Sequence, residues 1–251
     1  MARIIGSPSR YIQGKGTLTE ITKYTERLGK KLLILVSKSG KKRVEEKINK
    51  AVEGTDTTVV WEIFNGECSK SEVNRIGENL KKEKCDIVVG IGGGKILDTA
   101  KAVAYYEDIA VVCVPTAAST DAPCSALSVL YTDDGQFDEY LWLPANPDII
   151  LLDTDIIVAA PVRLIVSGMG DALATYFETR ACMRSNTTSC MGGSVSKTAM
   201  ALSELCFKTL MEDGAKALLA VNAGACTPAV ENIIEANTYL SGIGFESGGI
   251  A

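Results

Sequence analysis

The residues best suited to chemistry are three consecutive glycines and a lysine, Gly92 to Lys95, in the stretch DIVVGIGGGKILDTAKAVA. An apolar run precedes the glycines and a helical pattern follows them, which predicts a strand, a tight turn and a helix. Glycines at such a turn let backbone N–H groups approach a phosphate closely, and the helix N-terminus adds the positive end of its dipole. The stretch therefore predicts a pyrophosphate site, although a plain strand-to-helix turn has the same pattern.

Two common phosphate-binding motifs do not fit this turn. A Walker A loop needs Ser or Thr after its lysine to bind magnesium, whereas Lys95 is followed by Ile96. The GxGxxG fingerprint would place its third glycine at Lys95. The glycines alone thus leave a ligand site and an ordinary turn equally open.

Four apolar runs alternate with helix-sized polar stretches in the first half of the chain. Continuous apolar strands are usually covered on both faces, and spacers of this length form the crossover helices of a parallel sheet. After them come a polar segment, TAASTDAPCSALS, a hairpin signal, DDGQF, and a fifth run at 148–152. The four runs are KLLILVS at 31–37, TTVVWEIF at 57–64, CDIVVGIG at 85–92 and IAVVCVP at 109–115.

Strand patterns end near Pro161, and helical patterns occupy the remaining chain. We therefore predict two domains: an α/β domain with a parallel, Rossmann-like sheet over residues 1–160, and an all-α domain over residues 161–251. The predicted helices of the second domain span Arg163–Arg184, Val195–Met211 and Ala229–Ile243.

The charge of the chain argues against one class of protein. The net charge of −5 argues against a nucleic-acid-binding protein, which normally presents a basic surface. The first 50 residues are nevertheless basic, and the cluster from Lys41 to Arg43 is either a solvated helix face or an edge that attracts an anionic ligand.

The eight cysteines include no CxxC pair, which favours reduced thiols in a cytoplasmic protein over a disulfide framework or a cysteine zinc site. The sequence shows neither a signal peptide nor an apolar stretch long enough to span a membrane. We therefore expect a cytoplasmic protein that does not associate with membranes.

Longer stretches carry a resemblance that the glycines alone do not. GIGGGKILDTAK resembles the cofactor loop of the iron-containing alcohol dehydrogenase superfamily. PTAASTDAPCSALSVLYTDDGQFDEYLWLPANPD and APVRLIVSGMGDALATYFETRAC resemble its glycerol dehydrogenase branch. The resemblance covers nearly the whole chain and implies NAD held between an α/β and a helical domain. It also implies hydride transfer from a small polyol to the nicotinamide ring, with glycerol oxidised to dihydroxyacetone.

The resemblance further implies which residues bind the cofactor. Gly93, Gly94 and Lys95 match the pyrophosphate loop, and Asp98 lies on the helix behind it. The positions that match the nicotinamide half are Thr116, Ser119, Ser125, Leu127 and Tyr131.

Two aspartates match the substrate and metal positions of the family. Asp121 matches the contact to the substrate hydroxyl, and Asp171 matches one ligand of a divalent metal, zinc or iron. Without the resemblance, Asp171 would be interpreted as a helix N-cap. No residue is assigned a catalytic role with certainty.

The sequence departs from the family at the metal site. Family members carry two metal-binding histidines beyond a segment resembling GIGFESGGIA, whereas this sequence ends at Ala251 and contains no histidine. Neither Glu178 nor the nearby cysteines have the spacing of replacement ligands. We therefore expect a C-terminally truncated chain with an incomplete metal site and an incomplete all-α domain. Its catalytic competence is expected to be doubtful because the metal-binding histidines are absent. A smaller departure, Cys124 in place of the usual threonine, is expected to be tolerated.

Two alternatives to a polyol dehydrogenase remain open. The first is a non-catalytic remnant that binds a dinucleotide or packs against other subunits. The second is the sister branch that acts on glycerol phosphate, although the match of Asp121 to a neutral polyol contact and the absence of a basic cluster near it disfavour this branch. Unpaired apolar helix faces in the second domain also predict a homo-oligomer.

Ser37 bears on the choice between NAD and NADP. In the resembling enzymes an aspartate at this position bonds the adenosine ribose and repels the extra phosphate of NADP. Here the position holds a serine, which is followed by Lys38. We therefore expect NAD binding to persist and discrimination against NADP to weaken.

Overall fold

The computed structural model describes residues 1–249, which form two compact units. The sheet unit contains residues 9–116 and 126–153. The helical unit contains residues 1–8, residues 117–125 and the chain from Thr154 onward. The helical unit thus takes in two segments that precede its helices in the sequence. In the described residues, no helix has the length and apolar character needed to cross a membrane.

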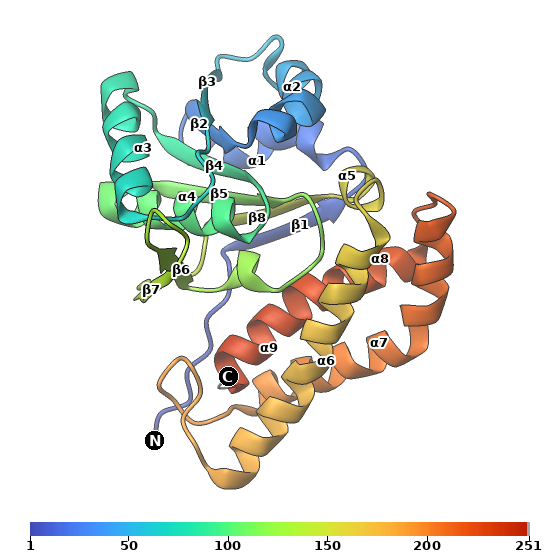
Figure 1. The fold of residues 1–251 in the computed structure, drawn as a ribbon. Helices are drawn as coiled ribbons and strands as arrows, with labels where there is room; N and C mark the ends of the chain where they lie inside the picture. The colour runs from blue at the N-terminus through green and yellow to red at the C-terminus, as the bar shows by residue number, and fades with distance from the viewer. Residues whose placement is uncertain (250–251) are drawn as a thin grey trace. The chain divides into compact units, whose positions relative to one another are not determined.

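Six parallel strands form the sheet unit's main sheet, in the order β1-β8-β5-β4-β2-β3 (Figure 1). All five predicted apolar runs are strands, and the four central ones are almost fully buried, as expected for a sheet covered on both faces. The strands are β1 (Arg10–Gly14), β2 (Lys31–Val36), β3 (Thr58–Ile63), β4 (Ile87–Gly92), β5 (Ala110–Pro115) and β8 (Ile149–Asp153).

Strand β1 is the strand that the sequence pattern did not predict. It pairs in parallel with β8, with Arg10 opposite Ile149, and lies at one edge of the sheet. Its residues are only partly buried, so its sequence lacks the continuous apolar run of a central strand. The predicted hairpin is present as a separate antiparallel pair, β6 (Leu127–Tyr131) and β7 (Phe137–Trp142).

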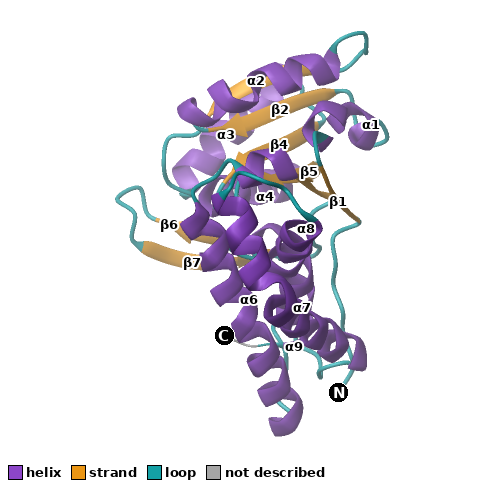
Figure 2. Ribbon diagram, turned by 90° about the vertical axis from the view of Figure 1, so that its right-hand side faces the viewer, coloured by secondary structure: helices purple, strands orange, loops and turns teal. Residues whose placement is uncertain are grey.

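The crossover helices lie on the two faces of the sheet (Figure 2). The chain moves from β2 outward to β3 and then back past β2 to β4, so right-handed crossovers place α2 on one face and α3 and α4 on the other. Helices α3 and α4 contact each other, and α2 contacts α1. The helices are α1 (Ile21–Thr25), α2 (Lys38–Val52), α3 (Lys70–Glu83) and α4 (Gly94–Glu107), with a 3₁₀ turn, η1, at Thr17–Glu20.

The helical unit is built from α6, α7 and α9, which pack against one another (Figure 1). The predicted helices are present, and the last one continues through a π-helical segment, η3, without leaving the helical path. The elements are α5 (Thr154–Val158), α6 (Val162–Ser185), α7 (Lys197–Asn222), α8 (Pro228–Glu235), η3 (Ala236–Leu240) and α9 (Ser241–Gly248), with a 3₁₀ turn, η2, at Ala122–Cys124.

Asp86 joins the starts of two neighbouring strands in the sheet unit. Its Oδ2 accepts hydrogen bonds from the backbone N–H groups of Lys30, at 2.8 Å, and Lys31, at 2.9 Å. These two bonds favour the ionised carboxylate and hold the pKa of Asp86 below its usual value. The carboxylate therefore fixes the entry of β2 beside β4.

We predict that Asp86→Ala lowers the free energy of unfolding by about 1 kcal/mol at pH 7, a value reduced by the exposure of the site. A lowered pKa stabilises the fold only while the carboxyl is ionised. The contribution should be complete above about pH 4 and shrink as the pH falls through the folded-state pKa. Urea unfolding of both proteins at pH 7 and pH 3 measures it, and an equal difference at the two pH values would contradict this role.

Candidate functional site

The turn between β4 and α4 leaves its backbone open. Helices α2 and α3 are capped by Ser37 and Ser69, whose hydroxyls accept backbone N–H bonds, whereas Gly93 at the start of α4 supplies no side-chain cap. A Cβ added to Gly93 or Gly94 would meet no atom within 4 Å. The first N–H groups of a 14-residue helix thus face accessible space, as a bound phosphate requires.

Strand order places this turn where ligands bind in open parallel sheets. From β2 the chain moves to one side, toward β3, and from β4 it moves to the other side, toward β5. The carboxyl ends of the adjacent strands β2 and β4 therefore form a topological switch point, where such folds bind dinucleotides. Val36 pairs with Ile91, so Ser37 and Gly92 leave neighbouring strands side by side, and the N–H of Thr116 bonds the Gly92 carbonyl at 3.1 Å.

Ser37 has a structural task in addition to its predicted contact with ribose. Its Oγ accepts a hydrogen bond from the N–H of Gly40 at 3.0 Å and so caps α2. Lys38 is exposed, while Lys41 lies 3.4 Å from Glu45 and 5.0 Å from the centre of the Trp61 ring.

Lys95, at the second position of α4, forms an ion pair across the turn. Its Nζ lies 2.6 Å from Oε1 and 2.7 Å from Oε2 of Glu67, a residue of the loop after β3. The same ammonium lies 5.3 Å from the centre of the Tyr131 ring, within the range of a cation–π contact. The structure thus brings together two predicted cofactor residues, Lys95 and Tyr131, and adds a carboxylate that no sequence motif indicated.

Asp98 lies one turn further along α4, in the protein interior. Its Oδ1 pairs with Lys101 Nζ at 2.9 Å, and its Oδ2 accepts the N–H of Val129 in β6 at 3.2 Å. Lys101 is 1% exposed and also donates to the Leu127 carbonyl. This buried pair holds β6, and with it two other predicted cofactor residues, Leu127 and Tyr131, against α4.

The remaining predicted residues belong to the helical unit. Ser119, Asp121 and Ser125 lie on the segment 117–125, and Asp171 lies on α6. The N–H of Asp121 donates to Oδ2 of Asp171 at 3.2 Å, and Oδ2 of Asp121 accepts the Ser241 hydroxyl at 2.7 Å. The two predicted aspartates are therefore neighbours. Ser241, which contacts Asp121, was not predicted, because the residues around it show only a helical pattern.

The interpretation of Asp171 as a helix N-cap is wrong. Helix α6 begins at Val162, so Asp171 lies in its interior, and Gly170 before it is helical. Gly168 of this helix serves close packing, because a Cβ there would lie 2.1 Å from the Ala118 carbonyl oxygen, whereas a Cβ at Gly170 would meet no atom within 4 Å. That carbonyl also accepts a 3.0 Å bond from Asn237. The segment carrying Asp121 is thus fixed against α6 and η3.

Burial and a second carboxylate change the acidity of Asp121. Burial raises its pKa, and the charge of Asp171 raises it further, to about 7, against the opposing effect of the Ser241 hydrogen bond. Glu178, two turns beyond Asp171, also has a raised pKa through burial and the charge of Asp171. Asp121 can therefore take up or release a proton near neutral pH.

The helical unit offers few side-chain donors for a divalent metal. Over residues 1–249 the structure contains no group of three His, Cys, Asp or Glu side chains able to hold a metal ion. Asp121 and Asp171 provide two carboxylates, whereas zinc takes three or four protein ligands. The described residues do not complete a metal centre, and a metal at Asp171 would require ligands beyond them.

Comparison with known proteins gives consistent matches. Residues 8–154 match the family described as iron-containing alcohol dehydrogenase. The chain is 50% identical over 251 residues to glycerol dehydrogenase of Citrobacter freundii, covering 100% of this chain and 69% of that protein. It is 49% identical to glycerol dehydrogenase of Escherichia coli, covering 100% of this chain and 68% of that protein. The crystal structure of a probable glycerol dehydrogenase from Sinorhizobium meliloti superposes with a TM-score of 0.91 at 43% identity, covering 100% of this chain and 69% of the other.

We predict that Lys101→Met destabilises the fold by about 3–5 kcal/mol, because it leaves the Asp98 carboxylate buried without a compensating charge. Replacing Asp98 with Asn in the same protein removes that charge while keeping an acceptor for the Val129 N–H, so the double variant should recover part of the loss. Guanidinium unfolding measures both effects. A double variant no more stable than Lys101→Met would refute the pairing.

Proposed function

The chain belongs to the iron-containing alcohol dehydrogenase family, and on this premise we propose that it oxidises glycerol, or a similar small polyol, with NAD as the hydride acceptor. The observation that carries the proposal is the identity of 49–50% to glycerol dehydrogenases along the whole chain. The open turn at the topological switch point supports it independently, because it offers a pyrophosphate site where this class of sheet binds dinucleotides.

In this proposal the sheet unit binds most of the cofactor. The N–H groups after Gly93 and Gly94 and the ammonium of Lys95 bind the pyrophosphate, and Ser37 contacts the adenosine ribose. Asp98 acts by holding β6 in place, since its Oδ2 accepts the Val129 N–H and its Oδ1 pairs with Lys101, which bonds the Leu127 carbonyl. Thr116, Leu127 and Tyr131 are the sheet unit's proposed contacts to the nicotinamide half, and Ser119 and Ser125 remain predicted cofactor residues.

Asp121 is the proposed substrate residue of the helical unit. Its carboxylate accepts a hydrogen bond from a polyol hydroxyl and so orients the carbon that gives up hydride. Ser241 keeps one oxygen of Asp121 in place. Asp171 remains the one proposed metal ligand, and no step is assigned to the metal.

A second candidate function rests on the donor set. Because the described residues supply two neighbouring carboxylates and no third ligand, a protein that binds the dinucleotide without turning over a polyol also fits the geometry. Such a protein would act through cofactor binding or through association with other subunits.

We also propose that the protein is cytoplasmic and forms a homo-oligomer. All eight cysteines are free, and burial raises the pKa of Cys68, Cys113 and Cys206 to about 12, which suits reduced thiols in the cytoplasm. Exposed apolar side chains on α6 and α7 support association into a homo-oligomer. They are Val166, Phe177, Met183, Leu205, Met211 and Leu219.

Turnover decides between the two candidates. We expect absorbance at 340 nm to rise when the protein is mixed with NAD and glycerol, with dihydroxyacetone as the product. Asp121→Asn should lower kcat/KM by about tenfold to hundredfold, the range for one hydrogen bond to a charged group, while leaving NADH affinity unchanged. NADH binding without any glycerol-dependent turnover would instead establish the non-catalytic function.

Position 37 provides a test of cofactor choice. We predict that Ser37→Asp raises the ratio of NADPH to NADH dissociation constants by about tenfold, because a carboxylate at the ribose repels the extra phosphate. Aspartate is also a good N-cap, so the cap of α2 should survive the change. Fluorescence titration of both cofactors measures the ratio. An unchanged ratio would mean that position 37 does not contact the ribose.

A further inference from the structure

The ion pair between Lys95 and Glu67 lies where the proposed function places the cofactor pyrophosphate. Both carboxylate oxygens of Glu67 are within 2.7 Å of the Lys95 ammonium. The ammonium is thus already paired with an anion on the same turn as the open N–H groups of Gly93 and Gly94. The side chains remain accessible, 47% for Lys95 and 27% for Glu67, so an incoming phosphate can reach them.

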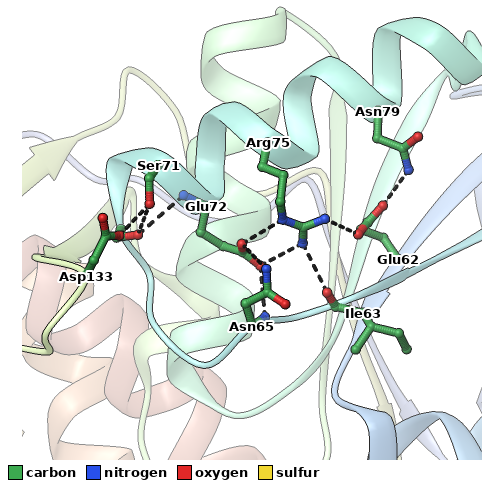
Figure 3. Close-up of polar contacts among 9 residues, drawn as sticks. Glu62, Ile63, Asn65, Ser71, Glu72, Arg75, Asn79 and Asp133 are labelled. Carbon is green, nitrogen blue, oxygen red and sulfur yellow. Dashed lines mark hydrogen bonds and ion pairs between the residues drawn. The ribbon is translucent and has the colours of Figure 1, made fainter.

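The loop that carries Glu67 is firmly held on both sides. Before it, the backbone N–H and the side-chain amide of Asn65 bond the Glu72 carboxylate at 2.9 and 3.0 Å, and Glu72 is in turn bound by Arg75 (Figure 3). After it, the Cys68 carbonyl accepts the N–H of Tyr131 at 2.8 Å. The fold therefore fixes the backbone of Glu67, and this fixed position brings its carboxylate within reach of Lys95.

The Glu67 side chain nevertheless has room to move. It lines an open pocket of about 270 Å³ bounded by polar residues of the loop, of α3 and of the β6–β7 turn. A carboxylate displaced from Lys95 could turn into this space without disturbing the backbone. The other lining residues are Asn65, Ser69, Ser71, Glu72, Arg75 and Asp133.

A carboxylate and a phosphate bind the Lys95 ammonium in the same way. Each is an oxygen anion that accepts charge-assisted hydrogen bonds from the ammonium, so the two compete for its donors. If Glu67 stays in place, its charge also repels the pyrophosphate at short range. In either case cofactor binding has to overcome an interaction that the free protein already makes.

We propose that Glu67 is a built-in competitor of the cofactor pyrophosphate: its carboxylate occupies Lys95 in the free protein, weakens dinucleotide binding and speeds dinucleotide release. The inference rests on the proposed binding of a dinucleotide at Gly93, Gly94 and Lys95. It assigns to Glu67 the tuning of affinity, with no part in the hydride transfer itself.

The test compares the whole chain with Glu67→Gln, which keeps the size and polarity of the side chain and removes its charge. We expect the dissociation constant for NADH, from fluorescence titration, to fall about twofold to fivefold, the upper range for one partly exposed charge interaction. The rate constant for NADH release, from stopped-flow displacement, should fall as well. ADP-ribose, which carries the pyrophosphate without nicotinamide, should show the same gain in affinity.

Two further variants serve as controls. Glu67→Asp keeps the charge and should stay near the wild-type affinity. Glu83→Gln removes a carboxylate of similar exposure that pairs with Lys31 at 3.5 Å, away from the turn, and should leave NADH affinity unchanged. Thermal unfolding of each variant verifies that the fold is intact.

Glu67→Gln with unchanged or weaker NADH affinity would overturn the proposal, since a residue that merely positions Lys95 for the phosphate predicts weaker binding. A gain for NADH without a gain for ADP-ribose would also overturn it. These failures differ from failure of the proposed dinucleotide binding, on which the inference rests, because neither the wild-type chain nor the variant would then bind NADH at all.

Discussion

The candidate cofactor site depends on one buried ion pair, between Asp98 and Lys101 of α4. Lys101 also bonds the Leu127 carbonyl, and Asp98 bonds the Val129 N–H, so the pair attaches the β6–β7 hairpin to the helix. Removing one member of such a pair leaves an uncompensated buried charge, and Asp98 Oδ1, which makes no hydrogen bond, relies on the Lys101 ammonium alone. Through β6 it places Tyr131 beside Lys95, and through the Tyr131 N–H it holds the loop that carries Glu67.

The same helix begins at the turn that the sheet topology selects for ligand binding. Parallel strands with crossovers to opposite sides leave a switch point beyond β2 and β4, and the glycines keep side chains out of it. Serines cap α2 and α3, whereas α4 leaves its first N–H groups for another partner. The packing of α4 thus holds in place a turn whose first N–H groups lack a side-chain cap, as the proposed phosphate site requires.

Local sequence patterns predicted the elements well and the contacts between distant residues poorly. The central strands were visible because both of their faces are buried, while β1 was missed because an edge strand needs no continuous apolar run. Asp171 resembled a cap beside Gly170, yet α6 starts nine residues before Asp171, and its Gly168 packs closely against Ala118. Glu67 and Ser241 escaped prediction because each acts through a partner distant in sequence, Lys95 for one and Asp121 for the other. The glycine turn by itself indicated a pyrophosphate site, whereas the remaining cofactor residues and the metal ligand came from family resemblance, since no spacing of residues indicates them.

The central claim, that a dinucleotide binds at the start of α4, is tested most directly by amide hydrogen exchange with and without NADH, followed by mass spectrometry of peptides. NADH should slow exchange in peptides spanning residues 91–98, because its pyrophosphate would engage N–H groups that now lack a side-chain cap. Peptides from the outer part of α7, such as residues 211–222, should be unchanged. Protection confined to other parts of the chain, with residues 91–98 unaffected at saturating NADH, would contradict the account.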